Sequence, residues 1–482
     1  MDHVMDGTAY AWSALGGDRA MPSRIEYRTV EGALPSSLPV MELARSCVAA
    51  CSLAAAELAA RRTGGPLPRV IVDDAAVATA FVSERELLVD GRVPHTFAPL
   101  SRFWRAKDGW VRTHANYPHH RARLLDALGI PDPGGETGDD AATVGRLASE
   151  LTLRAAEEIE ETVNAAGGLA IAVRGPVEWA AHPQGLAAAA LPLVHRERLG
   201  HGPVRSLSAL PATGPVLPAS GVRVLDLTRV LAGPVATRTL ALLGADVLRI
   251  DAPQLPEIAD HHADTGFGKR SAVLDLGSRA DRDTFEDLLS TADVVVTGYR
   301  PGALDRHGLA PAALAERRPG VVVARLSAWG TEGPWAGRRG FDSLVQAASG
   351  IAATESGPDG RPGALPAQAL DHGSGYLLAA GVLRALTEQQ DEGGSRLATL
   401  ALARTAAWLL TGIGGSAPVG AAREADRTGR SAPADDTRSR PAETTGPLGT
   451  MRYARSPVAF DGSPEDWASP PGVWGTDRPA WR

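Results

Sequence analysis

Cysteine is scarce in this sequence: only Cys47 and Cys51 occur, one helical turn apart in "ARSCVAACSLAAAELAARR". Residues spaced in this way share one face of a helix, where free cysteines behave as small apolar residues. A disulfide framework or a metal site would need further cysteines or histidines in the cluster. We therefore expect both thiols to pack in a core, and we expect no metal site.

An excess of positive charge is also missing. The formal net charge is -7 and lysine is rare, whereas nucleic-acid-binding proteins show a basic surplus. The start, "MDHVMDGTAYAWSALGG", has no basic n-region and no apolar h-region, and no uninterrupted apolar run reaches membrane-spanning length. We expect a cytoplasmic protein that binds neither nucleic acid nor a membrane. Small anionic ligands remain possible, because local arginines can bind them whatever the net charge.

The chain is long enough for several domains, because 482 residues exceed what one core usually organises. Residues 1–90 contain an Ala-rich helix, a "TGGPLPR" turn, the strand "RVIVDD" and another helix, and residues 91–200 look like a small α/β domain. Dense Pro, Gly and Ser predict a linker at 201–220. A polar, Pro/Gly-rich stretch predicts a flexible linker at 413–448, followed by a C-terminal tail at 449–482.

Residues 221–412 have a different pattern, in which short strands alternate with helices. The runs "VRVLDLT", "DVLRID", "SAVLDL", "DVVVTGY" and "VVVARLS" are rich in β-branched residues, and helical or turn segments separate most of them. This alternation is typical of βαβ units. We predict an α/β fold with a doubly wound, Rossmann-like parallel sheet in a large domain, accompanied by the smaller α/β domain.

The ends of these strands carry the candidate binding groups. The first βα connection, "LDLTRVLAGPVATRT", can bring backbone N–H groups to an anion, but it lacks G-x-G-x-x-G, so a dinucleotide site is poorly supported. Arginines gather near the predicted carboxyl ends, where open α/β sheets bind ligands, and guanidinium groups suit a polyphosphate. A separate stretch, "LPAQALDHGSGYLLAAG", places Asp371 before a small-residue helix; the simplest interpretation is an N-cap.

Several of these stretches together resemble a known family. "VRVLDLTRVLAGPVATRTLALLGADVLRID", "GFGKRSAVLDL", "ADVVVTGYRPGALDRHGL" and "SAWGTEGPWAGRRGFDSLVQAASG" are similar, in this order, to motifs of the family III CoA-transferases, which include formyl-CoA and carnitine CoA-transferases. The similarity runs from Gly221 to about Gly412. It implies a Rossmann-like CoA-binding large domain at 221–412, coenzyme A or acyl-CoA as substrate, and a carboxylic acid as the second substrate.

The resemblance also assigns residues. It makes Asp371 the catalytic nucleophile, which would form an aspartyl-CoA intermediate. The CoA contacts that it implies are Arg229, Val230, Leu231, Ala232, Arg249, Leu274, Tyr299, Arg300, Ala303, Arg306, Arg339 and Phe341. The glycines of "DHGSG" would let backbone N–H groups reach an oxyanion, and the helix N-terminus would keep Asp371 ionised.

The order of the parts departs from the family. Sequence similar to the family's small domain precedes the large domain, and "GTMRYARSPVAFDGSP" resembles the tail that returns to the large domain. "SLAAAELAARRTGGPLPRVIVDDAA" also parallels "LLAAGVLRALTEQQDEGGSRLATLALA", with Ala44 or Ser46 opposite Asp371. Two fused and trimmed copies would explain both observations. One chain could then supply a full set of domains, and a homodimer is the alternative.

Two other functions stay open beside CoA transfer. Acyl-CoA racemases of the family use a His/Asp acid–base pair, but Phe341 stands where those enzymes have histidine. His372, next to Asp371, is a weak substitute because it points elsewhere on the helix. The rearranged order would also suit a noncatalytic CoA-binding subunit, against which Asp371 itself argues.

Overall fold

A seven-stranded sheet forms the centre of the computed structural model, which describes residues 6–95, 97–132, 140–211, 213–413 and 440–482. The strand order is β10-β9-β8-β11-β12-β13-β7, with β8 to β13 mutually parallel and β7 antiparallel to β13. The strands are β7 (His195–Gly200), β8 (Arg223–Leu227), β9 (Asp246–Asp251), β10 (Arg270–Val273), β11 (Val294–Thr297), β12 (Val322–Ser327) and β13 (Ser395–Ala401). The parallel strands follow the order of a doubly wound Rossmann sheet, which confirms the predicted fold class.

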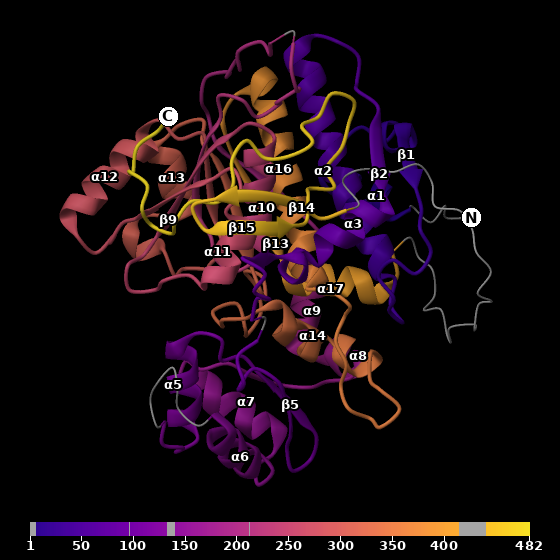
Figure 1. Ribbon diagram of the computed structural model, residues 1–482, viewed down its shortest axis with the longest axis vertical. Helices are drawn as coiled ribbons and strands as arrows, with labels where there is room; N and C mark the ends of the chain where they lie inside the picture. Colours follow the sequence, from indigo (N-terminus) through magenta and orange to yellow (C-terminus); the bar gives the residue numbers. More distant parts are fainter. Residues whose placement is uncertain (1–5, 96, 133–139, 212, 414–439) are drawn as a thin grey trace.

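Alternating side chains of these strands enter two different cores. Val224 and Val294 pack with α10 (Ala232–Leu242) and α16 (Ala369–Glu392), whereas Leu225 and Val295 pack with α12 (Arg279–Ser290) and α13 (Pro311–Arg317). Because successive residues of a strand point to opposite faces, a continuous apolar run is buried on both sides. Figure 1 shows α12 and α13 at the left of the large body and α16 nearer its middle.

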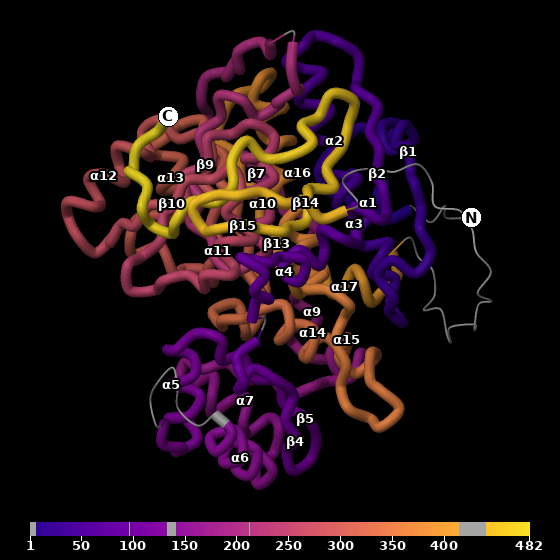
Figure 2. Tube along the Cα trace, viewed as in Figure 1, coloured from indigo at the N-terminus to yellow at the C-terminus, as the bar shows by residue number. Residues whose placement is uncertain are grey.

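The N-terminal segment belongs to the core of the large body. Its longest helix, α2 (Val40–Thr63), packs along α16, and a Cβ atom at Gly373 would lie 3.3 Å from Cys47 Sγ. Both cysteines of α2 are free and buried, as expected. α2 is long and apolar enough to cross a membrane, contrary to expectation, because an 18-residue window in it has a mean hydropathy of 1.4; however, 83% of that window is buried inside the protein. It serves here as a core helix (Figure 2).

The other elements of this segment repeat the pattern around α16. The order α2–β2–α3 matches α16–β13–α17, and α2 and α16 each have 24 residues. The parallel pair β1–β2 is likewise matched by β12–β13. The elements are α1 (Gly7–Ala14), β1 (Ile25–Arg28), β2 (Val70–Asp73), α3 (Asp74–Phe81), α4 (Ser83–Glu86), β3 (Leu88–Val89) and α17 (Leu402–Thr411).

A small unit with its own core lies below the large body in Figure 1. It consists of the antiparallel strands β4 (Phe103–Arg105), β5 (Trp110–Thr113) and β6 (Ala170–Ala172) with α5 (Pro118–Ala127), α6 (Asp140–Leu151) and α7 (Ala156–Ala165). The expected boundary at residue 200 is too far along the chain. After α8 (Pro176–Ala181) and α9 (Pro183–Ala190), β7 pairs with β13, because the open edge of the large sheet offers it a ladder of backbone partners.

Two connections were expected to be linkers. No helix or strand lies among the described residues of 201–220, yet Arg62 fixes this connection by donating hydrogen bonds to the carbonyl oxygens of Ser208, Pro218 and Ser220. Most of the second linker, 414–439, lies outside the described residues. Its final part is a strand: β14 (Ala442–Gly446) pairs with β15 (Gly449–Tyr453), so the tail begins before residue 449.

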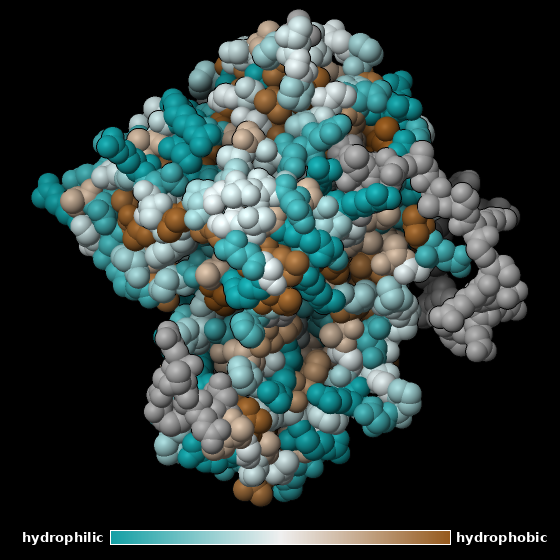
Figure 3. Space-filling model, in the orientation of Figure 1, coloured by the Kyte–Doolittle hydropathy of each residue, from teal (hydrophilic) through white to brown (hydrophobic). Residues whose placement is uncertain are grey.

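The C-terminal tail contacts both the N-terminal segment and the large sheet. β15 pairs with β3 of the N-terminal segment, and the later tail runs along β10, where the Asp477 amide donates to the Ser271 carbonyl at 2.8 Å. This covers a sheet edge that would otherwise expose unpaired backbone groups. Hydrophobic and polar side chains are interspersed on the face shown in Figure 3. The remaining short helices are α11 (Ala259–Thr265), α14 (Asp342–Ser349) and α15 (Ile351–Thr354).

Candidate functional site

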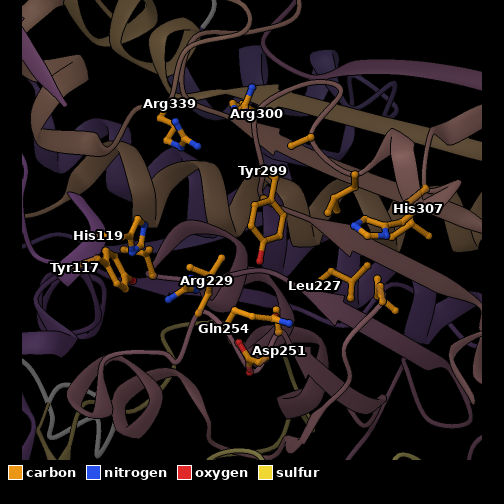
Figure 4. Close-up of a pocket in the computed structure, with 18 of the residues that line it drawn as sticks. Tyr117, His119, Leu227, Arg229, Asp251, Gln254, Tyr299, Arg300, His307 and Arg339 are labelled. Atoms are coloured by element: carbon orange, nitrogen blue, oxygen red, sulfur yellow. The ribbon is translucent and has the colours of Figure 1, made fainter. Parts of the chain in front are cut away.

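A cavity of about 680 Å³ opens at the carboxyl ends of the parallel strands. Leu227 ends β8, Asp251 ends β9 and Ser327 ends β12, and all three line the cavity. This edge of an open α/β sheet is where its ligands bind. Figure 4 shows Tyr299 in the middle of the lining, with Arg300 and Arg339 on one side and Asp251 and Gln254 on the other.

Most of the expected CoA contacts lie together here. The cavity is lined by Arg229, Val230, Leu274, Tyr299, Arg300, Ala303, Arg306, Arg339 and Phe341. They come from four separate stretches of sequence that the parallel sheet brings to one edge.

Three of the expected contacts do not line the cavity. Leu231 and Ala232, at the start of α10, are buried in the body, because the chain turns inward there. Arg249 is buried and forms ion pairs with Asp251 at 2.8 Å and with Glu257 at 2.9 Å, so its guanidinium is used inside the protein. The resemblance did not reveal Glu257, because no motif marks the acid that pairs with this arginine.

The cavity is rich in positive charge. Within the described residues, no carboxylate lies at ion-pair distance from Arg300, Arg306 or Arg339. Burial lowers the pKa of Arg339, and the neighbouring guanidinium groups of Arg300 and Arg123 lower it further. Like charges this close repel each other, so a bound polyanion would relieve the repulsion.

The small unit supplies one wall of the same cavity. Tyr117, His119, His120 and Arg123, which sit at or in α5, face the large body. Burial first, and then nearby His119 and arginines, lower the pKa of His120 to about 3, so its ring is neutral at physiological pH. Sequence reasoning missed these residues, although "NYPHHRAR" offered a signal in its clustered histidines and arginines. One chain therefore provides both walls.

Asp371 lies beside this cavity rather than in its lining. It is the third residue of α16, and Gln368 is the N-cap, so the N-cap interpretation is wrong. Asp342 takes the capping role instead: its Oδ2 accepts from the amides of Leu370 at 2.9 Å and Asp371 at 3.0 Å. Phe341, the residue before Asp342, lines the cavity. The Phe341–Asp342 step therefore connects the cavity wall with Asp371.

The carboxyl group of Asp371 is in an unfavourable place for charge. It is buried, and no group among the described residues donates a hydrogen bond to it. Burial, followed by the charges of Asp342 and Glu84, raises its pKa well above the ordinary value, and burial raises the pKa of Asp342 to about 6. This contradicts the expectation that the helix terminus keeps Asp371 ionised, because Asp342 already occupies the free N–H groups.

His372 and the nearby glycines have structural contacts. His372 Nε2 is 3.1 Å from Glu84 Oε2, its ring packs on Phe81, and it faces away from the cavity. Gly373 and Gly375 lie within α16, where they allow close packing on α2 and α10. The expected oxyanion site at these glycines is therefore wrong, since their amides are inside the helix.

The sequence is similar to proteins of one known family. Residues 219–443 match the family model described as CoA-transferase family III. A probable fatty acyl-CoA transferase of Mycobacterium tuberculosis is 36% identical over 197 residues, which cover 38% of this chain and 50% of that protein. The formyl-CoA:oxalate CoA-transferase of Streptomyces coelicolor is 34% identical over 193 residues, 38% of this chain and 47% of that protein.

A longer alignment and a solved structure complete the comparison. An acetyl-coenzyme A transferase of Hypoxylon pulicicidum is 29% identical over 332 residues, 66% of this chain and 55% of that protein. A crystal structure of a Mycobacterium tuberculosis protein has 35% sequence identity and a TM-score of 0.39, covering 41% of this chain and 57% of that one. The chain spans about half the length of the curated relatives that it matches.

Proposed function

We propose that this chain, which belongs to CoA-transferase family III, moves CoA from an acyl-CoA donor to a carboxylic acid acceptor, with Asp371 as the nucleophile. The proposal depends mainly on one observation: the cavity lies next to the start of α16. An arginine-rich cavity at the strand ends is bounded by Phe341, and Asp342, the next residue, holds the start of the helix that bears Asp371. This arrangement supports the binding of a polyphosphate close to a reacting carboxylate.

The chemistry follows from a carboxylate nucleophile. Asp371 attacks the donor thioester carbonyl and expels CoA thiolate, which leaves a mixed anhydride. The thiolate then attacks the aspartyl carbonyl, releasing the donor acid and forming an aspartyl-CoA thioester. The acceptor carboxylate attacks that thioester and expels the thiolate, which leaves a second mixed anhydride between Asp371 and the acceptor. The thiolate then attacks the acceptor carbonyl of this anhydride, which gives the new acyl-CoA and frees Asp371.

The surroundings of Asp371 suit this sequence of steps. An anhydride is readily hydrolysed, and burial keeps water from it. A carboxylate without hydrogen-bond donors is also a stronger nucleophile once ionised. Because burial, Asp342 and Glu84 raise the pKa of Asp371, we expect kcat to increase with pH as the pair ionises.

Trapping the intermediate tests the proposal. The protein is incubated with a panel of acyl-CoAs, treated with hydroxylamine, and the peptide bearing residue 371 is examined by mass spectrometry. We expect a hydroxamate on Asp371 with at least one donor and none in Asp371→Asn, which should still bind CoA. CoA binding without any adduct across the panel would support a noncatalytic CoA-binding protein. Solvent deuterium at the α-carbon of an acyl-CoA, without an acceptor acid, would support a racemase.

A further inference from the structure

A tyrosine of the small unit is bonded to a buried acid of the large body. The hydroxyl of Tyr117 donates a hydrogen bond to Glu257 Oε1 at 2.7 Å. Glu257 lies between β9 and α11, and its side chain has no exposed surface. Tyr117 lines the cavity, whereas Glu257 stands behind the lining. The bond therefore joins the two units at the cavity wall.

The same carboxylate holds the turn that follows β8. Glu257 Oε2 accepts from the amide of Val230 at 3.0 Å and from Arg249 Nη2 at 2.9 Å. Val230 has a φ of 70°, a left-handed conformation that β-branched residues rarely adopt. Such a conformation persists only where the surroundings fix it. Glu257 supplies a fixed acceptor for the amide that this conformation turns inward.

Arg229 completes the arrangement. Its guanidinium lies 4.7 Å from the centre of the Tyr117 ring, and its Nη2 donates to the Pro256 carbonyl at 2.9 Å. Burial alone raises the pKa of Glu257, but Arg249, Arg229 and His261 more than offset this and bring it to about 2. Glu257 therefore stays charged over the whole working range of pH. Three cavity-lining residues, Tyr117, Arg229 and Val230, are arranged around this one charge.

We propose that Glu257 is a positioning residue that fixes the Arg229–Val230 turn and the small unit together, so that the cavity presents one rigid surface to CoA. The role of the cavity in binding CoA rests on the proposed function. Glu257 acts through Val230 and Tyr117 and does not touch the substrate. Loss of either bond loosens one wall and weakens CoA binding, while the reacting group at Asp371 is left in place.

Two variants and one matched control test the proposal. Tyr117→Phe removes one hydroxyl and keeps the ring beneath Arg229. Glu257→Gln keeps the size of the side chain but replaces one acceptor oxygen with a donor. Tyr453→Phe is the control, because its hydroxyl also donates to a carboxylate, that of Asp466 at 2.5 Å, and neither residue lines the cavity. Dissociation constants for free CoA are measured by calorimetry, and hydrogen exchange of peptides covering 228–232 is measured without ligand.

We expect Tyr117→Phe to weaken CoA binding about tenfold, as for a lost hydrogen bond to a charged group, with kcat changed less than about twofold. Glu257→Gln should weaken binding at least as much and accelerate exchange at Val230, and Tyr453→Phe should do neither. If Tyr117→Phe binds CoA as tightly as the control Tyr453→Phe, the proposal is wrong. This test does not require that Glu257→Gln folds. Unchanged exchange in folded Glu257→Gln would also overturn it. Weaker binding and faster exchange without any transferase activity would support the positioning role and reject the proposed function.

Discussion

The amide of Asp371 donates a hydrogen bond to Oδ2 of Asp342, 3.0 Å away. Two acids that share one helix start thus have different tasks. Asp342 caps α16 from a neighbouring helix, and the carboxyl group of Asp371 is left free of hydrogen-bond donors among the described residues. An acid held in this way by its backbone keeps its side chain available for reaction.

Removing the charge of Asp371 should stabilise the protein in a pH-dependent way. Its folded-state pKa is raised, so the folded protein holds this proton more tightly than the unfolded chain and loses stability as pH rises past the ordinary value. We expect Asp371→Asn to gain about 1 to 3 kcal/mol over the wild type at pH 8 and much less at pH 5. Thermal unfolding at both pH values measures this. The exposed Asp283→Asn serves as control, and a gain that is larger at pH 5 would contradict the argument.

The cavity arginines should bind the phosphates of CoA. We expect Arg300→Ala and Arg339→Ala each to raise KM for an acyl-CoA about tenfold, and less at high salt, because charge-assisted contacts are lost. The same variants should leave KM unchanged for the corresponding acyl-pantetheine thioester, which has no phosphate. Arg279→Ala, at a side chain that is 90% exposed, is the matched control. Equal losses with both thioesters would exclude a phosphate-binding role.

Two glycines of α16 should differ in their tolerance of a methyl group. A Cβ atom at Gly375 would lie 2.6 Å from the carbonyl oxygen of Ala232, which is backbone, whereas one at Gly373 would lie 3.3 Å from Cys47 Sγ. We expect Gly375→Ala to cost about 2 to 3 kcal/mol in chemical unfolding and Gly373→Ala about 1 kcal/mol or less. Adding Cys47→Ala should relieve Gly373→Ala only. A reversed order of the two costs would show that α10 can shift and α2 cannot.

Lys269 should be essential for stability although it lies outside the cavity lining. Its ammonium is buried, and it donates to Asp226 Oδ2 at 3.0 Å, to the Pro234 carbonyl at 3.0 Å and to Thr237 Oγ1 at 2.5 Å. Lys269→Met leaves the Asp226 charge without its cation, and we expect a loss of about 3 to 5 kcal/mol in urea unfolding. The double variant Lys269→Met/Asp226→Asn should recover part of this loss. No recovery would mean that the lost hydrogen bonds to Pro234 and Thr237, rather than the unpaired charge, carry the effect.

The sequence was sufficient to predict the features that depend on local pattern. β-branched runs separated by helices predicted the parallel sheet, and because such strands end at one edge, nine of the twelve expected contacts line one cavity. Arg249 was misplaced because its acid partners, Asp251 and Glu257, compete with any ligand, and Glu257 lies in a segment without a recognisable motif. The N-cap assignment of Asp371 failed because the cap comes from Asp342, 29 positions earlier in the chain.

The sequence predicted a small α/β domain but not that its residues would line the cavity. Tyr117 and His120 reach the cavity only because a separate core places α5 against the large body, and no periodicity in the sequence encodes that placement. The same is true of the pairing of β7 with β13, which depends on a free sheet edge nearly two hundred residues away in sequence. The internal repeat could be recognised in the sequence, and the structure agrees with it: α2 and α16 have the same length, and each is followed by a strand.

The packing of α2 on α16 also constrains how the protein is made. During synthesis α2, at Val40–Thr63, leaves the ribosome long before Ala369–Glu392, its main neighbour in the core, has been translated. At about 5 to 20 residues per second the interval is on the order of 15 to 65 s. The face of α2 that packs on α16 has no partner during that time, and non-local contacts of this kind slow folding. The core of the large body can therefore be completed only after α16 has been translated.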